Sequence, residues 1–264
     1  MQQNILAVEA VSLKHAPSLV AWFLGAVLSL MAVDAQAITL TQIAATSRQA
    51  STGAFKATEM PAVTQHASLP RQNGRHTQTG ALPQWQRVMV AMGNQAPKFK
   101  ACLEDRGNCS TANMQVWRDL VKVAQQLDQA GKLRIVNAFF NRFAYVSDKE
   151  RYGAREYWAS PAEFLRNSGD CEDYAIVKYF TLAFLGFTDN DMRVVAVMDT
   201  SRQIAHSVLA VKLDNKTWVL DNLSEGVFAD AAYTHYAPKF SVNMSGRWVY
   251  ASNVVPAKFE VAAE

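Results

Sequence analysis

Apolar side chains recur every three or four residues through the middle of the chain, which is the spacing of one buried helical face. The recurrence predicts helices over about 84–92, 112–130, 133–143 and 171–186. A further short helix is expected to begin at Ser160-Pro161-Ala162-Glu163. Ser160 can cap it, Pro161 suits the first helical position and Glu163 completes a capping box. Residues 147–159 are charged and aromatic and are expected to form an extended loop.

Beyond the last of these helices, the period of the apolar residues changes from 3.6 to 2, the spacing of β-strands. The pattern predicts strands over 192–198, 207–213 and 217–221, a turn at 214–216, and further short strands around 240–242 and 247–250. Helices therefore come first and an antiparallel sheet follows, which is an α+β arrangement in one domain.

The two ends of the chain differ from this domain. An uncharged run from Ala16 to Val33 is followed by Ala35-Gln36-Ala37, which fits a small-x-small cleavage pattern, so residues 1–37 are interpreted as a signal peptide for export. An uncleaved membrane anchor is the alternative. Residues 38–82 are rich in Ala, Thr, Gln and Ser and are expected to be a flexible linker. The folded domain is expected over 83–255, with a tail at 256–264.

Composition adds two constraints. The net charge is only +3 and no basic block occurs, so a nucleic-acid partner is not expected. Of the three cysteines, Cys102 and Cys109 lie close together with turn-forming residues between them. In an oxidising compartment they are expected to form a disulfide, although two free buried thiols would also fit. The pairing would leave Cys171 as the odd thiol.

The stretch from Ser168 to Ala175 carries the strongest candidate chemistry. Gly169 and Asp170 interrupt and cap the chain just before an apolar helix, and Asp173 stands at the third helical position. Cys171 is therefore expected at a helix N-terminus, where unpaired N–H groups and the helix dipole favour a thiolate. The alternative is a small buried residue at a helix start.

A thiol nucleophile needs a base, and the base needs a group that orients it. Only His206 and His235 follow the cysteine, and His206 stands at the start of a predicted strand whereas His235 lies in a Tyr-rich loop. Asp221 ends the next strand on the same face as His206. Two turn registers place it opposite Val208 or Ala210, and neither puts it directly across from His206. A bulge or slip would be needed for that, so the distance between the two side chains stays open. A satisfied strand-end histidine and a turn-capping acid are the alternatives.

Asp170, Glu172 and Asp173 place three carboxylates within one turn of the cysteine. Nearby anions raise a thiol pKa, so a positive group such as the His206 imidazolium or a bound cation is expected to compensate. Hard oxygen ligands suit Ca²⁺. Capping by Asp170 and Asp173, with Glu172 in solvent, is the competing interpretation.

Three motifs together resemble the bacterial transglutaminase-like cysteine proteinases, specifically their LapG type. The motifs are Gly169–Ala175, His206–Leu209 and Leu220–Asn222, and the stretches Tyr157–Leu165 and Phe240–Asn243 add to them. The resemblance covers about residues 85–250. It implies a papain/transglutaminase-like cysteine protease fold, with helices packed on an antiparallel sheet.

The resemblance also implies roles for individual residues. Cys171 would be the nucleophile, His206 the base and Asp221 the group that orients it. Asp170 and Glu172 would belong to a Ca²⁺ site needed for activity, with Asp173 as a weaker candidate ligand.

Finally, the resemblance implies a biological setting. The expected substrate is the N-terminal region of a large RTX-type surface adhesin, cut at a paired-alanine motif in the periplasm, which promotes biofilm dispersal. The expected regulator is an inner-membrane cyclic-di-GMP receptor of LapD type. A transglutaminase-type acyl transferase and a catalytically inactive module that binds an adhesin or a receptor remain as alternatives.

Overall fold

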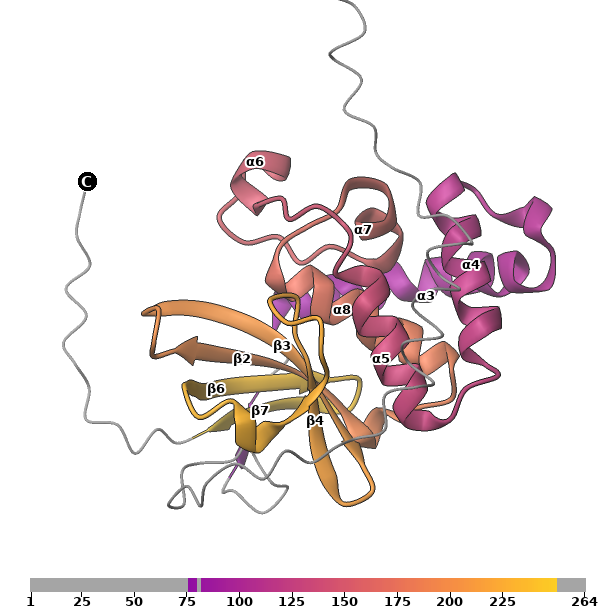
Figure 1. The fold of residues 1–264 in the computed structure, drawn as a ribbon. Coiled ribbons are helices and arrows are strands. Elements are labelled where there is room, and N and C mark those ends of the chain that lie inside the picture. The colour runs from indigo at the N-terminus through magenta and orange to yellow at the C-terminus, as the bar shows by residue number, and fades with distance from the viewer. Residues whose placement is uncertain (1–75, 80–81, 251–264) are drawn as a thin grey trace, which may run out of the picture. The chain divides into compact units, whose positions relative to one another are not determined.

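The computed structural model describes residues 76–79 and 82–250, and within them helices precede most of a sheet (Figure 1). The helices are α3 (Pro83–Glu104), α4 (Ala112–Ala124), α5 (Gln129–Phe140), α6 (Asp148–Tyr152), α7 (Pro161–Asn167) and α8 (Cys171–Phe184), with short 3₁₀ turns η1 (Arg106–Asn108), η2 (Asp189–Asp191) and η3 (Asp230–Ala232). The strands are β1 (His76–Thr79), β2 (Met192–Asp199), β3 (Ile204–Leu213), β4 (Lys216–Leu220), β5 (Phe228–Ala229), β6 (Tyr236–Asn243) and β7 (Gly246–Tyr250).

The strands within these residues form one seven-stranded sheet in the order β1-β7-β6-β2-β3-β4-β5, and every neighbouring pair is antiparallel. The sheet lies on one side and the helices on the other (Figure 1). The predicted α+β class is therefore confirmed.

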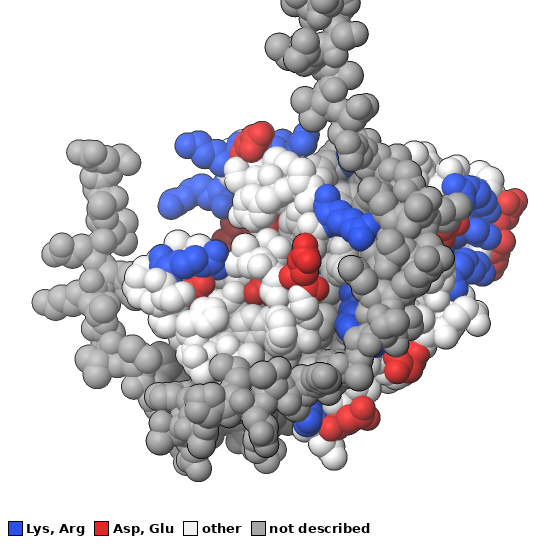
Figure 2. Space-filling model, in the orientation of Figure 1, with Lys and Arg blue, Asp and Glu red and all other residues white. Residues whose placement is uncertain are grey.

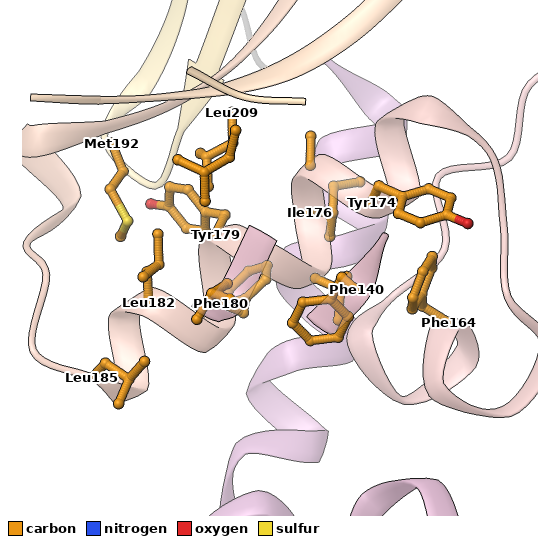
Figure 3. Close-up of a cluster of buried hydrophobic side chains, with 14 of the residues drawn as sticks. Phe140, Phe164, Tyr174, Ile176, Tyr179, Phe180, Leu182, Leu185, Met192 and Leu209 are labelled. Carbon is orange, nitrogen blue, oxygen red and sulfur yellow. The ribbon is translucent and has the colours of Figure 1, made fainter. Parts of the chain in front are cut away.

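Helix α8 joins these two layers. It packs against β2 and β3 on one side and against α5 and α7 on the other. In Figure 3, Ile176 of α8 lies between Leu209 of β3 and Phe140 of α5. All three side chains are fully buried. A helix that is buried all round belongs in the centre of a fold, so the residue at its first position is held by the core.

Several predicted helix boundaries were wrong, and α3 continues to Glu104, well beyond the end expected near residue 92. The helix expected over 112–130 ends at Ala124, and α5 begins at Gln129 because the Asp128 carboxylate accepts a hydrogen bond from the Gly131 N–H at 2.6 Å. The loop expected over 147–159 contains α6. Ser147 caps that helix through the Glu150 N–H, and Gly153, with a φ of 64°, ends it.

The observed strands differ from the predicted ones mainly in length. β3 and β4 are joined by Asp214 and Asn215, both with positive φ as a two-residue hairpin turn requires. β6 is longer than expected, and β5 was missed. β1 falls inside the segment expected to be a linker, so residues 76–79 of that segment are a strand. The predicted leader, the rest of the linker and the tail lie outside the described residues.

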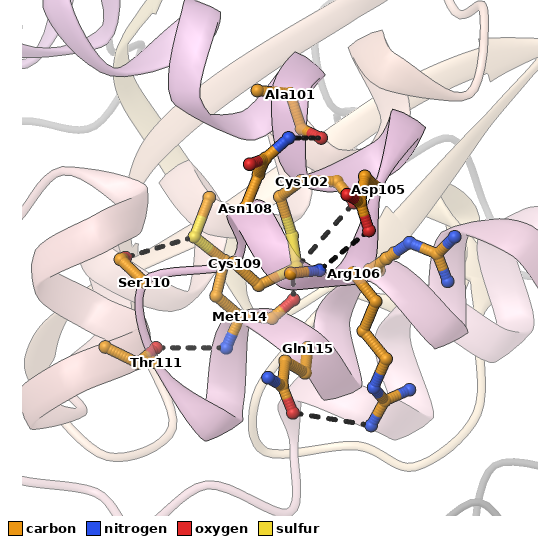
Figure 4. The surroundings of a disulfide bond; sticks show 12 residues. Ala101, Cys102, Asp105, Arg106, Asn108, Cys109, Ser110, Thr111, Met114 and Gln115 are labelled. Carbon is orange, nitrogen blue, oxygen red and sulfur yellow. Dashed lines mark hydrogen bonds between the residues drawn. A yellow bond between two sulfur atoms is a disulfide. The ribbon is translucent and has the colours of Figure 1, made fainter.

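The predicted disulfide between Cys102 and Cys109 is confirmed, with an S–S distance of 1.97 Å. It joins the last turn of α3 to the segment before α4 (Figure 4). Around it, Thr111 caps α4 by accepting a hydrogen bond from the Met114 N–H. Cys171 is left as the free thiol.

Charged side chains of both signs are interspersed on the face shown in Figure 2. Within residues 76–79 and 82–250, no helix combines the length and apolar character that crossing a membrane requires.

Candidate active site

Cys171 is the first residue of α8, as the sequence predicts. The N–H of Asp170 donates to Asp173 Oδ2 at 3.2 Å, which is one half of a capping box between these two residues. A Cβ atom at Gly169 would overlap the Asp173 carboxylate, so only glycine allows the chain to come this close. The cysteine is partly exposed on this fixed turn.

The sulfur of Cys171 faces acidic neighbours. Its Sγ lies 3.2 Å from Glu172 Oε2, to which the thiol donates. Burial raises the pKa of Cys171, and the charges of Glu172 and Asp170 raise it further. A hydrogen bond from the Ser207 backbone N–H acts in the opposite direction and favours the thiolate. That contact places the sulfur at β3, next to the residue that follows His206 in the chain.

His206 and Asp221 form a buried pair. His206 Nε2 lies 2.9 Å from Asp221 Oδ1, and the side chains are 4% and 1% exposed. Although burial disfavours its charge, Asp221 has a lowered pKa because His206, the Leu223 N–H and the Tyr236 hydroxyl all stabilise the carboxylate. An ionised carboxylate only accepts hydrogen bonds, so Nε2 carries the proton. Nδ1 is left as the imidazole atom available to a substrate or thiol.

The ladder between β3 and β4 contains no bulge. β3 and β4 keep a regular register, with Leu209 opposite Leu220 across the ladder. Continued by one step, this register places Asp221 across from Val208, two residues from His206. Diagonal neighbours on an antiparallel pair lie within reach of long side chains, and the imidazole spans this distance. A bulge or slip is therefore not needed, and the expected pairing of His206 with Asp221 is present.

Four carboxylates gather at the start of α8. Asp170, Glu172 and Asp173 are at most 9% exposed, so the idea that Glu172 is solvated was wrong. Asp148 joins them, and ligand atoms of Asp148, Asp170 and Asp173 lie within 4.8 Å of one another. A second such group combines Asp170 and Glu172 with the Cys171 sulfur.

The charges of this cluster are incompletely compensated by the protein. Burial, reinforced by neighbouring acids, raises the pKa of Asp148 to about 6, of Asp170 to about 7 and of Asp173 to about 9. Within the described residues, Asp148 Oδ1 and Asp170 Oδ1 are buried without a hydrogen-bond partner. Clustered carboxylate oxygens with unused lone pairs are the ligands that a hard divalent cation prefers.

Sequence reasoning missed Asp148 because it placed this residue in a loop. The signal was present as Ser147-Asp148-Lys149-Glu150, a serine followed three residues later by glutamate, which is the pattern of a helix start. The short helix turns Asp148 inward, and its N–H donates to Asp170 Oδ2 at 3.3 Å.

Comparisons with known proteins identify the family and the fold. The family model described as bacterial transglutaminase-like cysteine proteinase BTLCP matches residues 95–254. The calcium-bound structure of Legionella pneumophila LapG is similar with a TM-score of 0.50 and 28% identity, over 59% of this chain and 90% of that chain. The EGTA-treated structure of LapG has a TM-score of 0.49 and 26% identity, over 67% and 90%. No curated protein sequence matches the chain.

Proposed function

The chain belongs to the bacterial transglutaminase-like cysteine proteinases, and from that premise we propose that it is an endopeptidase whose chemistry is carried by Cys171, His206 and Asp221. One observation carries the proposal. The imidazole bound to Asp221 stands on β3 next to Ser207, and the Ser207 N–H touches the Cys171 sulfur. These contacts support a site that combines a thiol at a helix start, a base and an orienting acid.

The mechanism uses these groups in order. Nδ1 of His206 takes the thiol proton as Cys171 Sγ attacks the scissile carbonyl, and the Cys171 backbone N–H donates to the developing oxyanion. The imidazolium then protonates the leaving amine as the C–N bond breaks. In the second half, His206 removes a proton from water, which attacks the thioester and releases the acid product and the thiol. Asp221 keeps the imidazole oriented throughout.

We propose that the acidic cluster binds Ca²⁺. Asp170 and Glu172 are the primary ligands, and Asp148 and Asp173 complete the set. The unpartnered oxygens of Asp148 and Asp170 support this assignment, as does the calcium-bound form of the similar LapG structure. The ion would supply positive charge beside the thiol, where the protein itself offers mainly carboxylates.

The proposed substrate is the N-terminal region of a large RTX-type surface adhesin, cut at paired alanines in the periplasm to promote biofilm dispersal. An inner-membrane cyclic-di-GMP receptor of LapD type would restrain the protease. Family membership supports the protease class, and the predicted export signal and the disulfide support an oxidising compartment.

The decisive experiment incubates the purified protein with the N-terminal segment of such an adhesin, with Ca²⁺ or with excess chelator. We expect a fragment with a free new N-terminus, which Cys171→Ala and His206→Ala abolish without loss of folded structure. An isopeptide product would instead assign the chain as an acyl transferase. Cleavage by either variant would refute the catalytic assignment, and an inactive wild type that still binds the adhesin would favour a binding module.

A further inference from the structure

A fully buried lysine lies on α8 two turns beyond the candidate nucleophile. Lys178 is 0% exposed, and its Nζ donates to Asn137 Oδ1 at 2.8 Å and to Asn141 Oδ1 at 2.7 Å. Asn137 belongs to α5, and Asn141, one turn further along the chain, is the C-cap residue of that helix. Neither family membership nor the proposed mechanism gives this cluster a role.

The other ends of the two amides reach the segment that follows β4. Asn141 Nδ2 donates to the carbonyl oxygens of Asp221 and Ser224, each at 2.8 Å. Asn137 Nδ2 donates to the carbonyl oxygens of Ser224 at 2.8 Å and Glu225 at 3.2 Å. Because an ammonium only donates, it fixes each amide oxygen toward itself and so directs both NH₂ groups at this segment.

Asp221 needs such support at this point of the chain. β4 ends at Leu220, so the strand ladder no longer holds the Asp221 backbone. Its carboxylate must nevertheless meet His206 at 2.9 Å. The Asn141 amide binds the Asp221 backbone carbonyl, and the Asp221 carboxylate binds the imidazole of His206.

We propose that Lys178, Asn137 and Asn141 are positioning residues that fix the segment 221–225, and through it set the orientation of Asp221 and His206. The inference rests on the proposed function of those two residues. A buried ammonium is costly, and an apolar side chain of similar length would fill the same space. Burial lowers the pKa of Lys178 to about 7, and the nearby Asp221 charge opposes this shift. The cluster contacts no reacting atom, so its effect is on geometry.

The test compares Lys178→Met, which removes the ammonium but keeps the side-chain length, with Asn141→Leu, which removes the amide. Lys132→Met is the matched control. Lys132 also links α5 to α8, because its Nζ donates to the carbonyl oxygen of Leu185, the C-cap residue of α8, at 3.4 Å. Each protein is assayed with a quenched fluorescent peptide containing the paired-alanine site. The downfield proton NMR signal of the hydrogen bond between His206 and Asp221 is recorded in parallel, with Asp221→Ala to assign it.

We expect kcat to fall about 10- to 100-fold in Lys178→Met and Asn141→Leu at unchanged KM, because small misplacements of catalytic groups have effects of this size. The downfield signal should shift or broaden in both, and Lys132→Met should match the wild type. If Lys178→Met does not fold, Asn141→Leu gives the same two measurements.

Folded variants with wild-type kcat and an unshifted signal would overturn the positioning role, as would an equal loss in Lys132→Met. If the wild type does not cleave the peptide, the proposed function fails. The NMR signal still reports whether the buried cluster holds Asp221 against His206.

Discussion

His206 and Asp221 share a hydrogen bond of 2.9 Å although they are not opposite each other on their strands. The bond runs diagonally across a regular ladder, and the Asp221 carboxylate also accepts hydrogen bonds from the Leu223 N–H and the Tyr236 hydroxyl. The aspartate therefore has three partners, of which only the imidazole is free to act on a substrate. We therefore expect different effects from replacing Asp221 and from removing the Tyr236 hydroxyl.

Replacing Asp221 with alanine should lower kcat by at least about 100-fold, because the imidazole loses the group that fixes its tautomer and orientation. Tyr236→Phe removes one hydrogen bond to Asp221 Oδ2, which lies 2.7 Å from the hydroxyl. We expect a smaller decrease there, of about 5-fold, as one hydrogen bond of about 1 kcal/mol would give. Steady-state cleavage of the paired-alanine peptide measures both. Equal effects of the two variants would contradict this ranking.

The sequence was sufficient to predict the elements that carry the chemistry. Cys171 stands at the start of an apolar helix with capping residues before it, and these signals are local. His206 lies on β3 and Asp221 directly follows β4, and the alternation of both strands is also readable locally. The hairpin of Asp214 and Asn215 then fixes the register between them, so their common face followed from counting residues.

Other features depend on contacts that local patterns do not encode. The diagonal reach of His206 does not follow from counting directly opposed residues, because it depends on the length of the imidazole side chain. Asp148 joins the acidic cluster through a five-residue helix whose apolar periodicity is too short to recognise. Lys178 occupies a position that the helical pattern would assign to the surface or to an apolar residue. Its burial is explained by its hydrogen bonds to Asn137 on the neighbouring helix α5 and to Asn141 at the C-cap of that helix.

Calcium should stabilise the folded chain through the acidic cluster. A ligand at about 100 times its Kd adds about 2.7 kcal/mol to the free energy of unfolding, which raises Tm by about 5–10 °C for a domain of this size. Differential scanning fluorimetry with Ca²⁺ and with chelator measures the shift. Chelation should also reduce cleavage.

Asp170→Asn should abolish the calcium-dependent rise in Tm, because it removes one of the two carboxylates with an unpartnered buried oxygen. Glu150→Gln is the control, since Glu150 lies on α6 beside Asp148 but its side chain is exposed. A calcium shift that survives in Asp170→Asn, or disappears equally in Glu150→Gln, would place the ion elsewhere.

The disulfide should affect stability and leave catalysis unchanged. It closes a short loop, with a sequence separation of 7 residues between Cys102 and Cys109. The loop-entropy relation gives about 2.5 kcal/mol for such a loop. We expect a double variant, Cys102→Ala with Cys109→Ala, to have a free energy of unfolding that is lower by this amount, as measured by urea unfolding. Its kcat and KM should stay at wild-type values. A large loss of kcat would show that the α3–α4 junction influences the active site.

The buried ammonium of Lys178 makes the free energy of unfolding depend on pH. In the folded chain burial lowers the Lys178 pKa to about 7, whereas in the unfolded chain a lysine titrates near 10.4. Two titratable groups face Lys178. The charge of Asp221 raises the Lys178 pKa. The Tyr174 ring lies 5.7 Å from Nζ, and its hydroxyl is neutral because burial raises the Tyr174 pKa. Between the two lysine pKa values the unfolded chain binds more protons, so the contribution of Lys178 to stability increases with pH.

The free energies of unfolding of the wild type and of Lys178→Met should therefore diverge as the pH rises. The difference in their free energies of unfolding, wild type minus variant, should increase from pH 7 to pH 9 by up to about 2.7 kcal/mol, the limit of about 1.36 kcal/mol for each pH unit. Below pH 6 the difference should be flat, because the lysine is then charged in both states. Urea unfolding at each pH measures it, and Lys132→Met provides the reference. A difference that stays constant from pH 6 to pH 9 would mean that the ammonium keeps its proton inside the fold.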